Sequence, residues 1–321
     1  MNWQAIKETI EQARIGAFNK LFDKIFLFLR LIIGITWKLS ADHIHIFLVE
    51  NLTGLMQKRH SDRKRYFEEQ RYTTQKYVIP FIEEIVAINE QTSILEVGCG
   101  EGGNLVPFLE AGCKRIVGVD MLKEKIENAT QFINGKANSQ KIEFLVNDIY
   151  NVNPESTGKF DIILTKDVLE HIHDQERFMP FIKRFLKPDG KIFLGFPPWQ
   201  NPFGGHQQIC ESKLLCILPY FHLLPRVLYI SILKFFGESN RKICALLEIK
   251  DTRISIEKFE RIVKTTNYRT EKQTFYLVNP NYEIKFGLKP RRAWKLISSI
   301  PYVRNFYITA VYYVISNNES N

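Results

Sequence analysis

The stretch "ILEVGCGEGG" places glycines and a carboxylate in a pattern that could hold a charged ligand. Gly98, Gly100 and Gly102 follow an apolar run and precede a helix-like pattern. Glycine weakens regular elements, so a ligand that needs the backbone close by would explain the loop. Glu96 lies inside the apolar run, where a charged carboxylate needs a partner. The pattern predicts that Glu96 holds a ligand ammonium, and the alternative is an acid exposed at the end of a strand.

Two further carboxylates each end or follow an apolar run. Asp120 ends "RIVGVD", and Asp148 follows "KIEFLVN". A carboxylate about 20 residues past a glycine loop can accept hydrogen bonds from ribose hydroxyls. Asp148 could accept from an exocyclic amine, with Met121 and Ile149 on either side of a flat ring. The predicted ligand therefore has an ammonium group, a ribose and a flat ring that carries an amine.

Histidines in "TKDVLEHIHD" and "NPFGGHQQ" are the candidates for moving a proton. An unperturbed histidine titrates near pH 6.5, which suits a general base at neutral pH. His206 is the preferred base, because a Gly-Gly-His loop can move over a substrate. The alternative is a histidine that fixes the loop backbone by hydrogen bonds. His171 is the second candidate, and His173 is expected to face solvent.

Short β-type runs alternate with helix-period segments from residue 93 onward. This alternation predicts an α/β fold with a parallel sheet and helices on both faces. The candidate residues follow predicted strands, so they meet at the carboxyl edge of the sheet, where open α/β folds bind ligands. The predicted strands are 93–97, 115–120, 141–148, 160–167, 191–196, 270–278 and 306–316, and the predicted helices are 77–88, 102–110, 123–133, 174–186 and 255–268.

The flanking segments are expected to be helical. The proline-containing, apolar stretch 197–250 interrupts the alternation and is typical of a helical cap. The apolar run 25–37 contains Arg30 and is shorter than the about 20 residues of a spanning helix, so we expect a buried or interfacial helix. The predicted division is a helical extension at 1–90, a domain at 91–316 with an insert at about 197–250, and a tail at 317–321.

Five segments, in this order and spacing, resemble the class I S-adenosylmethionine-dependent methyltransferases. They are "ILEVGCGEGG", "VGVDM", "NDI", "FDIILTKDVLEHIHD" and "LKPDGKIFLGFPP". The resemblance covers residues 91–200 closely and 250–316 in pattern only. It implies a Rossmann-like, mostly parallel sheet of seven strands, with S-adenosylmethionine as cofactor and S-adenosylhomocysteine as its product.

The resemblance also implies a role for each site residue. Glu96 and the glycines would hold the methionine part of the cofactor, Asp120 the ribose and Asp148 the adenine. Lys166 and Asp167 would lie near the reactive sulfonium. The cofactor-binding set is Glu96, Gly98, Cys99, Gly100, Gly102, Asp120, Met121, Asp148, Ile149 and Lys166, and the catalytic set is His206, His171 and Asp167. Cys99 is interpreted as a packing residue and not as a nucleophile.

A metal is an alternative at the fourth strand. The "D-x-x-E-H" pattern of Asp167, Glu170 and His171 resembles a motif of some quinone-biosynthetic O-methyltransferases, in which two carboxylates and a histidine can bind a divalent cation. The two carboxylates could equally cap the following helix. We therefore assign no metal ligand from the sequence.

A nicotinamide dinucleotide is the rival ligand for the glycine loop. Gly98, Gly100 and Gly103 satisfy the G-x-G-x-x-G fingerprint of dinucleotide-binding folds. However, Glu96 directly before the loop would repel a pyrophosphate and suits an ammonium. This charge, together with Asp148 and the later motifs, favours the methyl donor.

The net charge of the chain indicates which kinds of partner the protein could bind. The chain has 44 Lys and Arg against 35 Asp and Glu, a formal net charge of +9. Anionic partners are therefore consistent with the composition: nucleic acid, a membrane surface or a phosphorylated substrate. Basic residues gather at 57–65 and at 285–304, and a solvated face is the alternative reading of each cluster.

We expect methyl transfer to a small-molecule acceptor, at oxygen, with a lipophilic molecule, a glycan or another metabolite as candidates. An RNA methyltransferase and a non-catalytic S-adenosylmethionine-binding protein are the alternatives. Nucleic acid is the less favoured partner, because the sequence has no N-P-P-Y-type motif. The five cysteines form no C-x-x-C pair and the polar N-terminus does not resemble a signal peptide, which favours the cytoplasm. Peripheral membrane contact through the apolar insert is a further expectation, and the sequence predicts no oligomeric state.

Overall fold

The computed structural model describes residues 62–318. The chain divides into two compact units, Met1–Leu55 and Met56–Asn321, and every described residue belongs to the second. The helix expected at 25–37 and the first part of the basic cluster at 57–65 lie outside the described residues. Among residues 62–318, no helix combines the length and the apolar character needed to cross a membrane.

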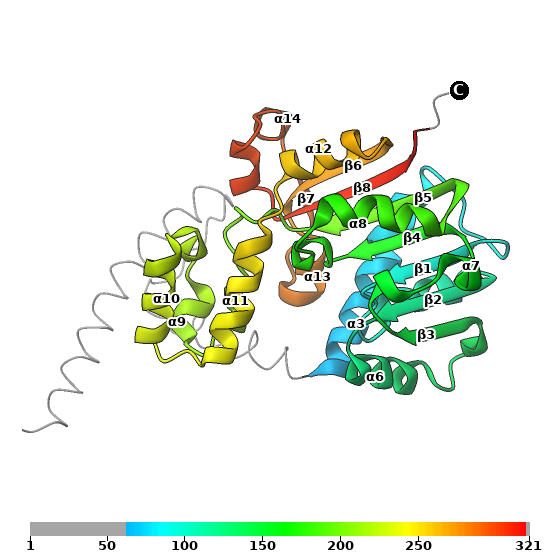
Figure 1. Ribbon diagram of the computed structural model, residues 1–321, viewed down its shortest axis with the longest axis horizontal. Coiled ribbons are helices and arrows are strands. Elements are labelled where there is room, and N and C mark those ends of the chain that lie inside the picture. Colours follow the sequence, from blue (N-terminus) through cyan, green and yellow to red (C-terminus); the bar gives the residue numbers. More distant parts are fainter. Residues whose placement is uncertain (1–61, 319–321) are drawn as a thin grey trace, which may run out of the picture. The chain divides into compact units, whose positions relative to one another are not determined.

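Within the described residues, eight strands form one sheet in the order β3-β2-β1-β4-β5-β8-β6-β7 (Figure 1). Strands β1 to β5 run parallel, and β8 pairs antiparallel with β5 and with β6. The bounds are β1 Ser93–Val97, β2 Arg115–Asp120, β3 Ile142–Val146, β4 Phe160–Lys166, β5 Leu186–Phe196, β6 Tyr268–Val278, β7 Arg291–Arg292 and β8 Ala310–Asn317. The predicted Rossmann-like α/β fold is confirmed. The predicted count of seven strands is corrected to eight, because β7 is two exposed arginines without the apolar alternation that indicates a strand.

The sheet is covered on both faces, which explains its apolar strands. All five residues of β1 are buried, as expected for a strand enclosed between two layers. One face packs on α8 and α12, where the Phe259 ring lies 5.1 Å from Phe196 and 4.7 Å from Tyr313. The other face packs on α4, α5 and α6. The helices are α3 Arg63–Thr73, α4 Ile79–Glu83, α5 Val106–Glu110, α6 Lys123–Ile133, α7 Pro154–Thr157, α8 Gln175–Ile182, α9 Lys213–Ile217, α10 Arg226–Phe235, α11 Asn240–Thr252, α12 Ile256–Thr265, α13 Asn281–Phe286 and α14 Lys295–Ser298.

Several boundaries differ from the sequence-based prediction. The helix expected at 102–110 starts with a 3₁₀ turn at Gly103–Leu105 before α5. The turn expected at 188–190 lies inside β5, which begins at Leu186. The last strand begins at Ala310 and not at 306, because Val303–Phe306 forms a 3₁₀ turn.

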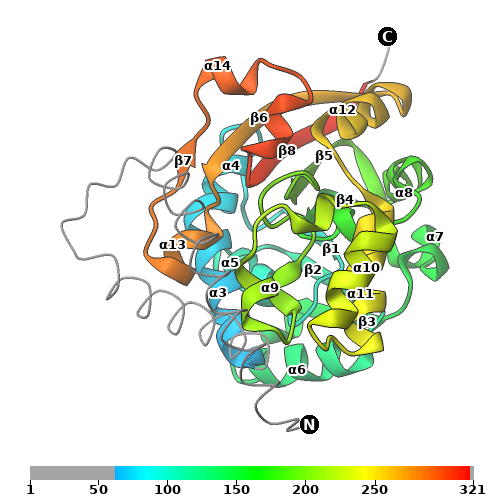
Figure 2. The same ribbon diagram turned by 90° about the vertical axis from the view of Figure 1, so that its left-hand side faces the viewer.

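Residues 197–252 contain α9, α10 and α11, which share a small core of their own. Leu215, Tyr229, Leu233 and Leu246 are fully buried in it. The three helices form a separate group beside the sheet (Figures 1 and 2). The end of α11 is tied to the segment after β4, because the Thr252 hydroxyl donates to the Glu170 carbonyl oxygen over 2.5 Å.

Helices α3 and α13 lie side by side, although more than half of the chain separates them (Figures 1 and 2). Glu283 of α13 receives hydrogen bonds from Tyr72, Lys76 and Tyr77, with a distance of 3.1 Å from Lys76 Nζ. The two helices form a wall next to the ends of β1 and β4.

Candidate functional site

The glycine loop after β1 combines left-handed backbone conformations with open space beside Gly100. Gly98 and Gly100 have φ of 71° and 53°, in the left-handed region that favours glycine. A Cβ at Gly98 would lie 2.6 Å from Val168 Cγ2, so a larger residue does not fit there. A Cβ at Gly100 would meet no atom within 4 Å. Although Gly100 is buried, the space on its Cβ side is open, and a ligand could lie against the loop there.

Glu96 is a fully buried carboxyl beside this loop. Asn104 Nδ2 donates to its Oε1 over 2.7 Å, and its Oε2 has no hydrogen-bond partner. Burial raises the pKa of Glu96 to about 8, against the opposing effects of Asn104 and Lys166. The alternative of an exposed strand-end acid is therefore wrong. A buried carboxyl oxygen without a partner is suited to accept from a ligand ammonium.

Asp120 connects the end of β2 to the glycine loop. Its Oδ2 accepts from the Gly100 N–H and its Oδ1 from the Leu122 N–H, each over 2.9 Å. Lys125 Nζ lies 4.0 Å from Oδ2. A carboxylate has about four acceptor positions, so capacity remains for hydroxyl groups of a ligand.

Asp148 and Ile149 lie at the end of the neighbouring strand. The Asn147 N–H donates to the Asp120 carbonyl oxygen over 3.0 Å, which brings the ends of β2 and β3 together. Asp148 caps the following turn by accepting from the Tyr150 N–H over 3.0 Å. Ile149 is buried, whereas Met121 is 67% exposed. An exposed side chain of this size could cover a flat ring.

Cys99 has no surface to offer a ligand through its side chain. It is fully buried, and burial raises the pKa of its thiol well above the usual value. Its N–H donates to Val119 and its carbonyl oxygen accepts from Gly102. These contacts favour the packing interpretation of this residue.

The buried Lys166 and the partly exposed Asp167 form an ion pair at the end of β4, with 2.7 Å between Nζ and Oδ2. Asp167 has φ of 57°, which turns the chain sharply after the strand. Burial disfavours the charged carboxylate, yet the charges of Lys166 and then Lys285 hold the pKa of Asp167 below its usual value. Asn281 Nδ2 of α13 lies 3.5 Å from Oδ2. Asp167 is therefore a fixed negative charge and is poorly suited to accept a proton at neutral pH.

Glu170, His171 and His206 come together next to this pair, with ligand atoms all within 4.8 Å of one another. His206 Nε2 lies 3.9 Å from Glu170 Oε1, and the two imidazole rings are 5.1 Å apart. Burial, and then the charge of Asp167, raises the pKa of Glu170 well above its usual value. His171 is exposed, yet partial desolvation by the surrounding protein and then the charge of Lys125 lower the pKa of its imidazole, which favours the neutral form.

One carboxyl and two imidazoles are ligands that zinc accepts. Glu170 Oε2 is buried and has no hydrogen-bond partner, so an unsatisfied oxygen is available within the group. The group differs from the predicted D-x-x-E-H alternative, since it contains His206 and not Asp167. His173 lies apart, exposed and 3.7 Å from Glu248, as expected for a solvent-facing residue.

The sequence patterns missed the residues that α3 and α13 bring to the site. Tyr66 of α3 and Tyr282 of α13 both lie close enough to the Asp167 charge for it to raise their pKa values, after the larger effect of burial. Arg63 Nε donates to the buried Glu101 of the glycine loop over 2.7 Å, which fixes α3 on the loop. No motif marked these side chains, and the only signal was the helical pattern of the segment before β1.

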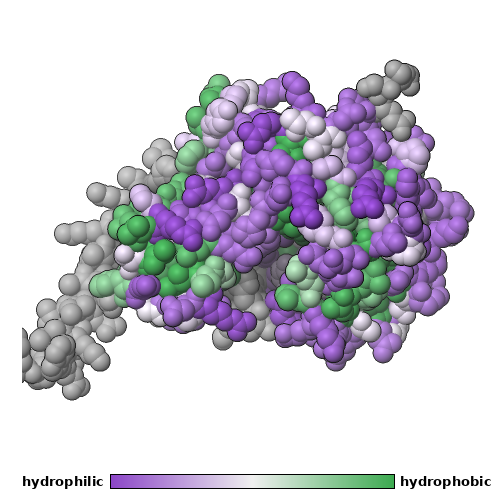
Figure 3. Space-filling model, viewed as in Figure 1, coloured by the Kyte–Doolittle hydropathy of each residue, from purple (hydrophilic) through white to green (hydrophobic). Residues whose placement is uncertain are grey.

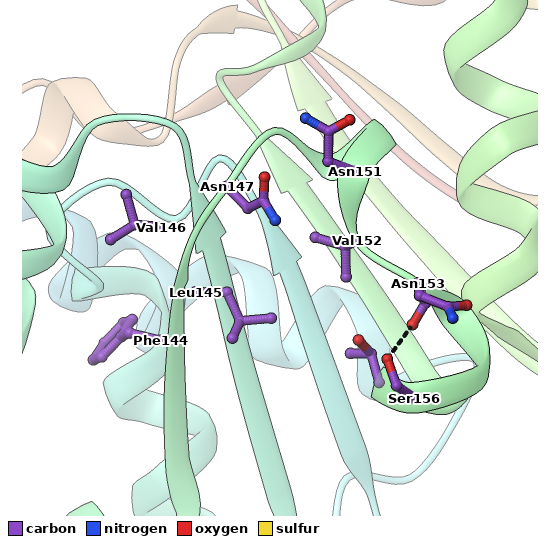
Figure 4. A pocket seen from close by; sticks show the side chains of 9 residues that line it. Phe144, Leu145, Val146, Asn147, Asn151, Val152, Asn153 and Ser156 are labelled. Atoms are coloured by element: carbon purple, nitrogen blue, oxygen red, sulfur yellow. Dashed lines mark hydrogen bonds between the residues drawn. The ribbon is translucent and has the colours of Figure 1, made fainter.

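A groove on the outer side of β3 is separate from these residues (Figure 4). It has a volume of about 380 Å³ and runs between β3 and α7. Its lining is Phe144, Leu145, Val146, Asn147, Asn151, Val152, Asn153, Ser156 and Thr157, none of which titrates near neutral pH. The groove is therefore no candidate for acid–base chemistry.

Comparison with known proteins identifies the central part of the chain. Residues 95–194 match the family model described as "Methyltransferase domain". This match agrees, for these residues, with the predicted resemblance to methyltransferases. It covers the glycine loop, Asp120, Asp148 and the segment after β4, but not His206.

Curated relatives match over a similar part of the chain. A "Ubiquinone biosynthesis O-methyltransferase" of Xanthomonas oryzae pv. oryzae is 31% identical over 101 residues, which are 32% of this chain and 41% of that protein. A "Ubiquinone biosynthesis O-methyltransferase, mitochondrial" of Dictyostelium discoideum is 28% identical over 112 residues, 33% of this chain and 35% of that protein. The match thus spans less than half of the length of either relative.

A solved structure is similar over more of the chain, at low identity. Magnesium protoporphyrin IX methyltransferase of Synechocystis PCC 6803, with bound S-adenosylhomocysteine, aligns with a TM-score of 0.47 and 12% identity. The alignment covers 84% of this chain and 99% of that one.

Proposed function

We propose that this protein, whose residues 95–194 match a methyltransferase domain, transfers a methyl group from S-adenosylmethionine to a hydroxyl of a small lipophilic molecule. One observation carries the proposal. The glycine loop and the unpartnered oxygen of Glu96 lie at the end of β1. The group of Glu170, His171 and His206 follows β4 and β5 at the same edge of the sheet. The printed function of the ubiquinone-related relatives supports transfer to oxygen.

The residues around the loop fit the proposed cofactor. Glu96 Oε2 would accept a hydrogen bond from the ammonium group of the cofactor. The open space beside Gly100 would hold the part of the cofactor that lies against the loop backbone. Asp120 has acceptor capacity for the ribose hydroxyls, and Asp148 with Ile149 would hold the adenine. When bound, S-adenosylmethionine supplies a methyl group that its sulfonium has already activated. The chain therefore has to align the acceptor, exclude water and remove a proton.

His206 is the proposed general base for the acceptor hydroxyl. A neutral imidazole removes a proton more readily from a phenolic hydroxyl, with a pKa of about 10, than from a less acidic alcohol. Burial, and then the charge of Asp167, raises the pKa of Glu170 well above its usual value, which favours an uncharged carboxyl beside the proposed base. We therefore propose a phenol-like hydroxyl as the acceptor group.

The acceptor pocket is proposed to lie between the α3–α13 wall and the insert. Tyr66 and Tyr282 supply aromatic surface near Asp167, and the apolar helices α9 to α11 cover the side beyond Glu170. Such a surround excludes water and favours a lipophilic acceptor over a sugar.

An acceptor search with methyl-labelled S-adenosylmethionine and an extract of the source cells tests this proposal. Products are separated into organic-soluble, polar small-molecule, RNA and protein fractions, and Asp120→Ala serves as the matched control. We expect label in the organic fraction, on a hydroxyl, from the unaltered protein only. Label in RNA would support the alternative nucleic-acid activity. Cofactor binding without any labelled product would support the non-catalytic alternative.

The raised pKa of Glu96 predicts that cofactor binding depends on pH. The free protein holds this carboxyl protonated below about pH 8, whereas pairing with an ammonium requires the carboxylate. Binding must therefore release a proton, and affinity should rise by up to about tenfold per pH unit between pH 6 and 7.5. Isothermal titration calorimetry with S-adenosylhomocysteine, in buffers of different ionisation enthalpy, measures both quantities. Glu96→Gln should bind more weakly and with no proton release, and a pH-independent affinity of the unaltered protein would contradict the prediction.

A further inference from the structure

The segment between β7 and β8 exposes a group of apolar and aromatic side chains. They form what we call the α14 surface: Trp294, Leu296, Ile300, Tyr302, Val303 and Tyr307. Trp294, Leu296 and Tyr302 are 69%, 76% and 71% exposed. Figure 3 shows apolar surface over the α14 region, at the upper left. Contiguous exposed apolar side chains of this size are typical of an interaction site.

Buried polar contacts hold this surface in place from below. Arg304 Nε donates to Glu257 over 2.8 Å, and its Nη2 donates to Glu260 over 2.5 Å. The Asn305 side chain is fully buried and accepts from the Ile256 N–H over 2.8 Å. The expectation that Arg304 belongs to an exposed basic cluster is therefore corrected. Since α12 fixes the segment on its inner side, the apolar side chains are presented outward by a defined structure.

Exposed positive charges border the α14 surface. The four bases are Lys289, Arg291, Arg292 and Lys295. Among the described residues, none of the four forms an ion pair with a carboxylate within 4.0 Å. The sequence has no acidic residue between Ile284 and Asn318. The charge of Arg292 acts on the nearby Glu84 carboxylate. Lys289, Arg291 and Lys295 are available to an anionic partner.

We propose that the α14 surface docks the protein on an anionic lipid bilayer. Tryptophan and tyrosine prefer the interface between headgroups and acyl chains, where leucine and isoleucine can also insert. Lysine and arginine beside them attract anionic headgroups. The combination of aromatic tips, aliphatic neighbours and a basic border matches this partner in both polarity and charge. This inference concerns binding and does not depend on the reaction.

A bilayer fits the charges better than the chain's own apolar run 25–37 does. The apolar run 25–37 could cover apolar side chains, but it contains Arg30 and no acid. It would therefore leave Lys289, Arg291 and Lys295 without counter-charges. A membrane supplies both an apolar layer and a dense array of anions.

The α14 surface also adjoins the insert. The Tyr220 hydroxyl of the insert donates to the Phe306 carbonyl oxygen over 2.9 Å, and their rings are 6.5 Å apart. Docking through the α14 surface would thus bring this end of the insert close to the bilayer. If the proposed function holds, a lipophilic acceptor could pass from the membrane toward the site.

Vesicle flotation with the full-length protein tests the proposal. The vesicles are phosphatidylcholine alone, or equal parts of phosphatidylcholine and phosphatidylglycerol. The test variants are the exposed pair Trp294→Ser with Leu296→Ser, and the charge variant Arg291→Gln with Arg292→Gln. Val227→Ser with Phe235→Ser, on the exposed side of α10, is the matched apolar control, since these side chains are 79% and 64% exposed.

We expect binding to the anionic vesicles only, with loss of about tenfold or more in the partition coefficient for the Trp294 and Leu296 variant. The charge variant should bind about tenfold more weakly, and added salt should weaken binding of the unaltered protein. The α10 control should bind as the unaltered protein does. Equal binding by the test variants, equal loss in the control, or no vesicle binding would each overturn the proposal. The fluorescence emission of Trp294, measured as the difference between the unaltered protein and Trp294→Phe, gives a further test. An emission that is already blue-shifted without vesicles would also overturn the proposal, because another part of the chain would then cover the surface.

Discussion

Replacing His206 with asparagine is expected to lower kcat by about 10² to 10⁴-fold, the usual range for loss of a general base. His206 lies at the start of a short turn with φ of 55°, and asparagine tolerates this left-handed conformation. The loop should therefore keep its shape while losing the group that accepts the proton. Affinity for S-adenosylhomocysteine should change little, because His206 contacts Glu170 and His171, which lie outside the predicted cofactor-binding set. Initial rates and calorimetry on the same preparations measure the two effects.

The pH profile separates a base from a structural residue. The unaltered enzyme should gain rate as pH rises through the titration of an imidazole, and this limb should be absent in His206→Asn. His173→Asn is the matched control, because His173 is 60% exposed and lies beside Glu248. An unchanged kcat in His206→Asn would assign His206 to loop structure. A rate that a chelator removes and zinc restores would assign it, with Glu170 and His171, to a metal site.

The parts of the site that the sequence predicted are local in the chain. Gly98 and Gly100 adopt left-handed conformations directly after an apolar strand, so residue type and position coincide. Asp120 ends β2 and Asp148 closely follows the neighbouring parallel strand β3, and a parallel sheet brings such ends together whatever the packing of its helices. These features need only the order of strands and turns, which alternating apolar patterns indicate.

The parts that were missed depend on packing between distant segments. Tyr66 reaches Asp167 only because α3 lies on the glycine loop, held by Arg63 and Glu101. Nothing in a polar helix before the first strand indicates which loop it will contact. The same applies to α13, since Tyr282 follows β6 in the chain but lies near the end of β4.

The sequence pattern of charged residues likewise does not show which of them pair with distant segments. Arg304 stands in a run without acids, and the run alone predicts an exposed basic face. Its partners, Glu257 and Glu260, belong to α12, more than 40 residues earlier in the chain. Conversely, Asp167 lies in a motif typical of metal ligands, yet the neighbouring Lys166 neutralises it. A charged residue's role is thus decided by partners that the sequence does not place.

Replacing Asp120 with alanine is expected to weaken S-adenosylmethionine binding by at least about 100-fold. Hydrogen bonds to a charged group contribute about 1.5–3 kcal/mol each, so losing two to a ribose has this effect. The same change leaves the Gly100 and Leu122 N–H groups without their acceptor, which loosens the glycine loop. Equilibrium binding by calorimetry measures the affinity. Glu124→Ala, an exposed acid nearby in α6, is the charge control and should bind normally.

A ligand without ribose hydroxyls separates the two contributions of Asp120. If the carboxylate contacts the ribose, an S-adenosylhomocysteine analogue that lacks both hydroxyls should bind the unaltered protein weakly. It should lose little further affinity in Asp120→Ala, because the interaction is already missing. If Asp120 acts only by holding Gly100, the variant should weaken both ligands by the same factor. Equal affinity of the variant and the unaltered protein for S-adenosylhomocysteine would contradict both roles. The strand-end carboxylate would then serve the fold alone, and the loop geometry at Gly100 would have to arise from the left-handed glycines themselves.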